Sequence, residues 1–310
     1  MKIPSLNDFK RFFDDPVWHS VAETILRRHQ IEFSLIKRAE HGENIVFLVD
    51  DTLVLKIYTP VKNGFHRERA GLEFASGRVG FPIPEIIEEG ELEGYYYLIL
   101  TQFRGEALTR ADWLKLDTRE QTVVLAQLAS GLKELHSQDP EDFDFDWREF
   151  LEIQVESAVD KQVRERANPE WLKSIPVYLE IGLPLIPDRI ADSFQHGDVH
   201  FGNLRFADKN GHIEICGLFD FADSIKGFHE YEFVAIGVLM IQGQGELQRE
   251  FFRAYGYKDA DIDETLRRRM MTLTILYEYS SLRRYAERLG VDPMEYTLDE
   301  LERAIWAFVR

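Results

Sequence analysis

The sequence predicts an α+β protein with two lobes, a small antiparallel β-sheet with one inserted helix followed by a mostly α-helical part. First, its 310 residues exceed the roughly 100–200 residues of a usual single domain. Second, strand-like segments gather in the first third of the chain. Third, apolar residues recur at helical spacing after Gly105. We therefore expect an N-terminal helical extension over residues 1–32, a β-rich N-lobe over 33–104 and a helical C-lobe over 105–310.

The N-terminal extension is predicted from residues 6–30, where apolar side chains recur at intervals of three and four. This is the period of an amphipathic helix, and we expect one or two helices that pack on the body. From Phe33 the period becomes that of strands, and the Asp50-Asp51 pair is typical of a hairpin turn. Three consecutive antiparallel strands are expected at 33–36, 45–49 and 52–58.

The rest of the N-lobe and the start of the C-lobe follow the same reasoning. A helical pattern covers residues 65–76, and two further strands are expected at 86–89 and 95–101. In the C-lobe, residues 119–136 place valines and leucines at helical spacing. A β island at 203–206 and 212–221 interrupts the helices, joined by Asn210-Gly211, a strong hairpin signal.

Composition limits the classes of partner. The formal net charge is −18, which argues against a nucleic-acid partner or an anionic membrane, because both require a basic surface. No segment approaches the about 18 apolar residues of a membrane span, and the N-terminus does not read as a signal peptide. The single cysteine, Cys216, lies in an apolar run and predicts a buried thiol in a reducing cytoplasm. A cationic ligand fits this charge better, although solubility alone also explains the acidic excess.

The most specific motif is the segment 196–203, His-Gly-Asp-Val-His-Phe-Gly-Asn, followed after the hairpin by Phe-Asp-Phe at 219–221. Phosphoryl transfer needs mainly positioning and charge neutralisation from a protein. Asp198 can accept the proton of an attacking hydroxyl or orient that hydroxyl. Asn203 and Asp220 offer the hard oxygen ligands that Mg²⁺ prefers. We interpret the two histidines as structural; the alternative, a polar loop that only caps turns, does not explain eight ordered positions.

On these motifs the chain resembles the aminoglycoside phosphotransferase family, bacterial relatives of protein kinases, from about residue 33 to at least 245. The resemblance implies a protein-kinase-like two-lobe fold in which Asp198 is the catalytic base and Asn203 and Asp220 bind Mg²⁺. Residues 227–233 are similar to the family's Gly-Asp-Pro-x-x-Asp-Leu-Ala stretch, with Glu232 in place of the usual aspartate. The Tyr-Glu pair at 231–232 resembles the hygromycin phosphotransferase branch.

The N-lobe provides an independent test, since a kinase-like fold requires a lysine on the third strand and an acid on the following helix. Lys56 lies in an apolar run, where an unpaired ammonium is costly. The family resemblance pairs it with Glu68 and directs it to the α- and β-phosphates of a nucleotide. The alternative is a strand lysine that extends to solvent and an unrelated helix acid.

The rest of the nucleotide site is less well defined by the sequence. The loop at 40–44 would cover the phosphates, yet Gly42 is its only glycine and it has no Gly-x-Gly-x-x-Gly motif. Backbone recognition of the purine leaves ATP and GTP both open. By resemblance, the purine contacts are the backbone of Thr101, Gln102 or Phe103 and the side chains of Val54 and Phe219.

Acidic residues mark where a phosphate acceptor would bind. Residues 139–156 hold eight acids and one arginine, a density that attracts a polyamine, although a solvated loop explains any single acid equally well. Glu232 has a second interpretation, because its family counterpart braces the catalytic loop. Tyr277 and Glu278 could form the far wall. The candidate acceptor contacts are Asp146, Glu149, Asp223, Glu230 and Glu232.

Three functions fit these observations. The first is transfer of the γ-phosphoryl group of ATP or GTP, with Mg²⁺, to a hydroxyl of an aminoglycoside or another cationic antibiotic, which would confer resistance. The second is a kinase of the same fold for an amino alcohol, sugar or amino acid. The third is a catalytically silent nucleotide-binding module, against which the intact set of motif residues argues. The sequence has no activation segment that ends in Ala-Pro-Glu, which argues against a kinase with a protein substrate. A monomer and a homodimer are both open.

Overall fold

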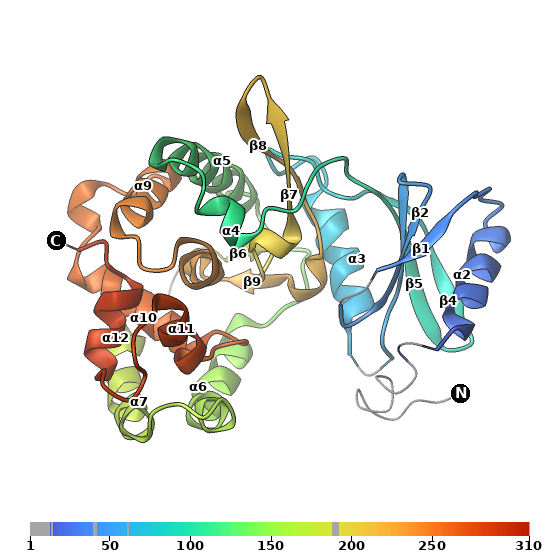
Figure 1. The fold of residues 1–310 in the computed structure, drawn as a ribbon. Coiled ribbons are helices and arrows are strands. Elements are labelled where there is room, and N and C mark those ends of the chain that lie inside the picture. Colours follow the sequence, from blue (N-terminus) through green and yellow to red (C-terminus); the bar gives the residue numbers. More distant parts are fainter. Residues whose placement is uncertain (1–12, 14, 40–41, 61, 188–191, 310) are drawn as a thin grey trace.

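The computed structural model describes residues 13, 15–39, 42–60, 62–187 and 192–309. Figure 1 shows a twisted sheet at one side of the molecule and a helical part at the other, with helix α3 between them. The sheet has five antiparallel strands in the order β1-β2-β3-β5-β4. The strands are β1 (Ile36–Arg38), β2 (Ile45–Val49), β3 (Leu53–Ile57), β4 (Ile86–Leu92) and β5 (Tyr95–Thr101).

The two faces of this sheet are covered by different helices. Side chains alternate along a strand, and on β3 the buried Leu55 and Ile57 pack in one cluster with Trp18 of α2 (Val17–Arg28). Val54 lies on the opposite face, in the cluster that contains Phe65 of α3 (Gly64–Ala75). Lys56 shares that second face by the same alternation. The period of two along β3 therefore directs the lysine toward α3.

Strand β1 begins later than the sequence predicts. The expected strand covers residues 33–36, whereas β1 starts at Ile36. The reason is the Asp50 side chain, whose carboxylate accepts hydrogen bonds from the backbone N–H groups of Ser34 and Leu35 at 2.8 and 2.7 Å. These donors are thereby diverted from the strand ladder. Asp50 and Asp51 have φ of 48° and 53°, as a tight hairpin turn requires, which confirms the predicted turn.

The helical part is built around a large apolar core and carries two short β-pairs, β6 with β9 and β7 with β8. The β7–β8 hairpin is the predicted island, and Asn210 adopts φ 58° in its turn. The strands are β6 (Ser193–Gln195), β7 (Leu204–Lys209), β8 (His212–Leu218) and β9 (Ile225–Gly227). The helices are α4 (Arg110–Trp113), α5 (Thr118–His136), α6 (Trp147–Arg164), α7 (Pro169–Gly182), α8 (Phe233–Ala235), α9 (Gly245–Tyr255), α10 (Glu264–Leu276), α11 (Leu282–Leu289) and α12 (Leu298–Ile305).

The predicted helices are confirmed where the structure describes them, and the prediction for Cys216 needs correction. Helices α3 and α5 match the expected 65–76 and 119–136 to within a residue. Of the expected N-terminal helix, α2 is present, while residues 6–12 and 14 lie outside the described residues. Cys216 is half-buried rather than buried, and its thiol donates to the carbonyl of Arg104 at 3.2 Å. Among the described residues, every helix is too short or too polar to cross a bilayer.

Candidate active site

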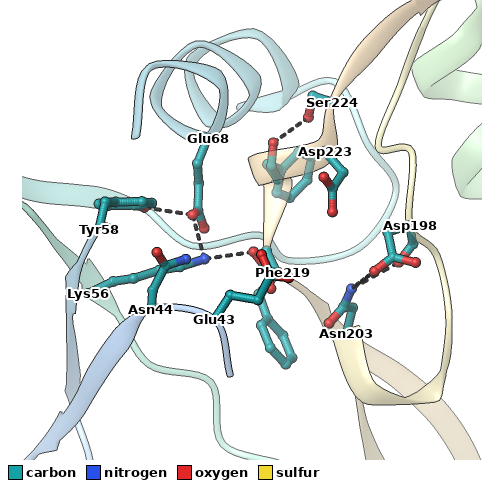
Figure 2. A network of polar contacts seen from close by, with 12 residues as sticks. Glu43, Asn44, Lys56, Tyr58, Glu68, Asp198, Asn203, Phe219, Asp223 and Ser224 are labelled. Carbon is teal, nitrogen blue, oxygen red and sulfur yellow. Dashed lines mark hydrogen bonds and ion pairs between the residues drawn. The ribbon is translucent and has the colours of Figure 1, made fainter. Parts of the chain in front are cut away.

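A buried ion-pair network lies on the α3 face of the sheet. Lys56 Nζ lies 2.5 Å from Glu68 Oε2 and donates to Asp220 Oδ1 at 2.6 Å. The Tyr58 hydroxyl donates to Glu68 Oε2 at 2.6 Å. Lys56 and Glu68 are 7% and 1% exposed, so neither charge is solvated. The structure thus brings together the lysine and the helix acid that the sequence predicts (Figure 2). The metal-binding candidate Asp220 joins the same lysine.

The charges of this network support one another. Burial lowers the pKa of Lys56, but attraction from Asp220 and Glu68 outweighs it and the net pKa is raised. Burial raises the pKa of Glu68 despite the opposing lysine. Burial also acts to raise the pKa of Asp220, yet Lys56 lowers it overall. The lysine is therefore charged and balanced by carboxylates, the state suited to receive a phosphate.

Helix α3 is pressed against the segment that carries Asp220. A Cβ on Gly71 would lie 2.5 Å from Ser224 Oγ and 3.1 Å from Phe221 Cβ, so only glycine fits without a shift. Asp220 itself has φ 68°, a left-handed conformation that is costly for a residue other than glycine and is typical of functional sites. This close contact sets the position of Glu68 relative to the Asp220 carboxylate.

The loop at 196–203 follows β6 and is braced by Glu232. The backbone N–H groups of His196 and Gly197 donate to Glu232 Oε2 and Oε1 at 2.6 and 3.0 Å. Gly197 has φ 86°, and a Cβ there would lie 2.1 Å from the carbonyl oxygen of Asp223. A buried carboxylate and a glycine therefore fix this loop where it passes the other motif.

His196 joins the two motifs. Its Nε2 lies 2.9 Å from the carbonyl oxygen of Phe219, and its Nδ1 accepts from the backbone N–H of Asp198 at 3.2 Å. Because Nδ1 accepts, Nε2 carries the proton in this arrangement. These two contacts support the interpretation of His196 as structural, because its ring links Phe219 of one motif to Asp198 of the other.

Asp198 is half-buried and has three side-chain neighbours. Asn203 Nδ2 donates to the Asp198 carbonyl at 2.9 Å and to Oδ2 at 3.2 Å, and His200 Nε2 lies 3.2 Å from the same Oδ2. The Tyr277 hydroxyl donates to Oδ1 at 3.2 Å. Burial lowers the pKa of His200, but its bond to Asp198 raises it overall. The carboxylate is thus oriented by fixed donors, as a base or an orienting group requires.

The metal-binding candidates fit a hard cation. The two donor bonds of the Asn203 amide nitrogen leave its Oδ1 free of any hydrogen bond from the described residues, and the Asp220 side chain is 41% exposed. Oxygen atoms of this kind suit Mg²⁺. The described residues contain no cluster of three or more His, Cys, Asp or Glu side chains able to hold a metal. A cation here would therefore take its other ligands from phosphate and water.

The predicted nucleotide contacts lie around the same space. Figure 2 shows the Lys56–Glu68 and Asp198–Asn203 pairs on opposite sides of it, with Phe219 between them. The phosphate-loop candidate Gly42 is exposed with φ 138°. Val54 is half-buried on the same face of β3 as Lys56. Val54 and Lys56 thus share the face of β3 that is turned toward α3.

The link after β5 narrows the choice of purine contact. The backbone N–H of Thr101 donates to the Glu85 carbonyl and that of Gln102 to the Thr52 carbonyl, at 3.0 and 2.8 Å. Of the three predicted backbone donors, Phe103 N–H alone has no protein acceptor within the described ranges. Its ring packs against Gly217, where a Cβ would lie 2.6 Å from it. Within the described residues, the backbone N–H of Phe103 is thus the donor of this link that no protein group occupies.

The acceptor-side candidates separate into two groups. Asp223 is half-buried, faces the same space as Asp198 (Figure 2) and accepts from the Tyr279 hydroxyl at 2.6 Å. Burial raises the pKa of Asp223, as do the charges of Asp198 and Asp220. Desolvation by the surrounding protein and the charge of Asp223 raise the pKa of Glu278, an exposed residue, against the opposing charges of Arg67 and Lys161. Carboxylates that repel one another in this way favour a cation between them.

The other four candidates have structural partners or lie at the surface. Glu230 is 1% exposed and is held by Arg269 Nε at 2.5 Å, which leaves it no access to an acceptor. Glu232 is equally buried and braces the catalytic loop, the second of its two predicted roles. Asp146 caps α6 by accepting from two backbone N–H groups, and Glu149 is exposed in the first turn of that helix. Glu232 therefore contacts the backbone beside Asp198, whereas no hydrogen bond or ion pair among the described residues joins Asp146, Glu149 or Glu230 to Asp198.

Sequence reasoning missed Tyr58 and Tyr279, and it placed Tyr277 in the far wall without its bond to Asp198. Tyr58 bonds Glu68, Tyr277 bonds Asp198 and Tyr279 bonds Asp223. A phenol in an apolar context carries no motif, so its partner is not visible in the sequence. The one available signal is the Tyr-Glu-Tyr triplet at 277–279, which follows an amphipathic helix and suggests a polar wall.

The fold and the site define a kinase-like phosphotransferase: a five-stranded sheet with a lysine–glutamate pair, joined to a helical lobe with an Asp-x4-Asn loop and a second aspartate. A family model described as the phosphotransferase enzyme family matches residues 36–270, more than half of the chain. The chain belongs to this family and is a phosphotransferase that acts on hydroxyl groups.

Solved structures agree on the fold. The chain is similar to the GDP complex of wild-type aminoglycoside 2'-phosphotransferase-IIIa, with 16% identity, a TM-score of 0.70 and coverage of 94% of this chain and 99% of the other. Aminoglycoside phosphotransferase APH(2'')-Ib, ADP-bound, gives 19% identity, a TM-score of 0.63 and coverage of 94% and 99%. Aminoglycoside phosphotransferase APH(4)-Ia gives 19% identity, a TM-score of 0.60 and coverage of 93% of this chain and 98% of the other. Curated protein sequences give no significant match. The predicted kinase-like fold is confirmed.

Proposed function

We propose that this protein transfers the γ-phosphoryl group of ATP or GTP to a hydroxyl of an aminoglycoside or a similar cationic antibiotic and thereby confers resistance. The observation that carries the proposal is the joint geometry of the two motifs. Lys56 is held by Glu68 and Asp220, and Asp198 is oriented by Asn203 across the same space. We place the boundary between the nucleotide-binding lobe and the acceptor lobe near Gly105, and the protein in the cytoplasm.

The chain's own groups would divide the work as follows. Lys56 binds the α- and β-phosphates, while Phe103 N–H and the side chains of Val54 and Phe219 hold the base. Asp198 orients the acceptor hydroxyl and takes its proton as the hydroxyl oxygen bonds to the γ-phosphorus and the bond to the β–γ bridging oxygen breaks. The nucleoside diphosphate leaves. Mg²⁺, held by Asn203 and Asp220, would neutralise phosphate charge when bound.

The cationic acceptor is supported by the electrostatics of the acceptor side. Asp223 and Glu278 both have a raised pKa, caused first by desolvation and then by neighbouring carboxylates. An ammonium group placed between them would relieve this repulsion. The net charge of −18 would also steer a polycation toward the protein. An amino alcohol shares this chemistry, and it is the acceptor of the alternative function.

The experiment is a phosphorylation assay read by mass spectrometry. ATP and GTP are supplied separately with Mg²⁺ and a panel that includes kanamycin, gentamicin and streptomycin, which are named in complexes of similar proteins. We expect one product heavier by one phosphoryl group. Asp198→Ala should lower kcat by about 10²–10⁴-fold and keep nucleotide binding. Asp160→Ala, an exposed aspartate of α6, is the matched control and should keep full activity.

Two outcomes would replace the proposal. If no antibiotic is modified but an amino alcohol, sugar or amino acid is, the protein is a metabolite kinase of this fold. Nucleotide binding without turnover on either panel would favour a silent nucleotide-binding module. Full activity of the Asp198→Ala variant would contradict the role given to this carboxylate.

A further inference from the structure

The hydroxyl of Tyr277 lies against the catalytic aspartate. It is placed between two acceptors, the carbonyl oxygen of Gly197 at 3.1 Å and Asp198 Oδ1 at 3.2 Å. Tyr277 is 2% exposed, and burial, followed by the negative charge of Asp198, raises the pKa of its phenol well above the ordinary value. The phenol is therefore a protonated donor, and its single proton can be given to either oxygen.

The two oxygens of Asp198 differ in their remaining capacity. A carboxylate oxygen has about two acceptor sites. Oδ2 faces two donors, Asn203 Nδ2 and His200 Nε2, each at 3.2 Å. Oδ1 faces only the Tyr277 hydroxyl among the described residues. The oxygen with an acceptor site left for a further hydroxyl is therefore Oδ1, on the side of Tyr277.

The backbone around Tyr277 is held from two sides. Lys161 Nζ donates to the Tyr277 carbonyl at 2.6 Å and to Gln154 Oε1 at 2.8 Å. The backbone N–H of Glu278 donates to the Tyr231 hydroxyl at 2.8 Å. These anchors come from α6 and from the 229–231 turn, which are separate from the catalytic loop. The phenol is thus fixed by the body of the helical lobe rather than by Asp198.

We propose that Tyr277 is a positioning residue that holds the Asp198 carboxylate so that Oδ1 faces the acceptor hydroxyl. This inference rests on the proposed function. In the transfer step the acceptor's proton passes to Oδ1, its oxygen bonds to the γ-phosphorus, and the nucleoside diphosphate leaves with the bonding electrons. Because Oδ1 has about two acceptor sites, the Tyr277 hydroxyl can keep its bond to Oδ1 while the acceptor hydroxyl uses the other site.

The test compares two matched tyrosine variants. Tyr277→Phe removes the bond to Asp198, and Tyr279→Phe removes the equivalent bond to Asp223, two residues away. The free energy of a hydrogen bond to a charged group corresponds to a rate decrease of about 10–100-fold when the bond is removed. We expect Tyr277→Phe to lower kcat by this factor with both KM values within twofold. Tyr279→Phe should instead raise the KM for the acceptor. A Tyr277→Phe enzyme with unchanged kcat would overturn the inference.

Two further measurements separate this inference from the proposed function. In the Asp198→Ala background, Tyr277→Phe should cause no additional loss of kcat, because it acts through the missing carboxylate; an additive loss would contradict the proposal. If the wild-type protein phosphorylates nothing, the proposed function fails. The contact is then tested by urea unfolding of both single variants and the double variant. Unfolding free energies that add would refute the Tyr277–Asp198 coupling whatever the acceptor is.

Discussion

The brace on the catalytic loop allows a quantitative prediction. Glu232→Gln keeps the side-chain volume but replaces one carboxylate oxygen by a donor. In either amide orientation, one of the backbone N–H groups of His196 and Gly197 then faces an N–H instead of an acceptor. Each of these bonds is made to a charged group, and such a bond contributes about 1.5–3 kcal/mol. Because Glu232 is 1% exposed, water cannot replace the lost partner.

We therefore expect Glu232→Gln to lower the free energy of unfolding by about 2–4 kcal/mol. At about 2 °C per kcal/mol, the low end for large domains, Tm would fall by about 4–8 °C. The loop also carries Asp198, so kcat should fall about 10-fold or more even at temperatures where the variant is folded. Urea unfolding followed by tryptophan fluorescence gives the first quantity, and the phosphorylation assay gives the second.

Glu230→Gln is the matched control. It also changes a buried glutamate, but one paired with Arg269 and Tyr257 rather than with the loop. Breaking a buried ion pair costs about 3–5 kcal/mol, so this variant should lose stability and yet keep kcat and both KM values when folded. Ordinary surface substitutions change the free energy of unfolding by less than about 0.5 kcal/mol. A change this small in Glu232→Gln would show that Glu232 does not brace the loop. A Glu230→Gln variant with a raised acceptor KM would return Glu230 to the acceptor site.

Two other positions give predictions of different kinds. Gly71→Ala should lower stability by about 1–3 kcal/mol through overpacking against Ser224, and it should weaken nucleotide binding because α3 carries Glu68. Gly64→Ala is the control, because a Cβ on Gly64 makes only ordinary contacts and should change neither quantity. Equal effects of the two variants in calorimetry would contradict this prediction. Burial lowers the pKa of Lys161 to about 8. Between pH 8 and the ordinary pKa of 10.5, the unfolded chain binds more protons at Lys161 than the folded protein does. The free energy of unfolding should therefore increase as the pH rises through this range. Urea unfolding at pH 7.5 and about 9.5 should show this gain and its loss in Lys161→Met; an identical pH dependence would refute it.

The sequence predicts the catalytic centre better than its surroundings, for a physical reason. Asp198, Asn203 and Asp220 lie in short motifs whose spacing is fixed by a turn and a hairpin, and Lys56 is directed by the period of two along one strand. Local geometry therefore places these four residues, and Lys56 meets Glu68, the partner that the sequence predicts for it, at 2.5 Å.

The acceptor side depends on contacts between distant segments, which local patterns do not encode. Glu230 and Glu232 are two residues apart, and both follow Asp220. Each is buried by a partner that lies far away in the sequence, Arg269 for Glu230 and the 196–197 backbone for Glu232. Tyr277 meets Asp198 across 79 residues. Charge and position in the sequence therefore could not separate a structural glutamate from a binding one.

The central claim is that Asp198 directs phosphoryl transfer from a nucleotide to a cationic alcohol. The most direct test follows the label from γ-³²P-ATP and γ-³²P-GTP into the aminoglycoside panel with wild-type protein and with Asp198→Ala. We predict labelled antibiotic with the wild type and a loss of about 10²–10⁴-fold with the variant, at equal nucleotide binding. Label that remains in the nucleotide with every acceptor, or equal transfer by both proteins, would contradict the account.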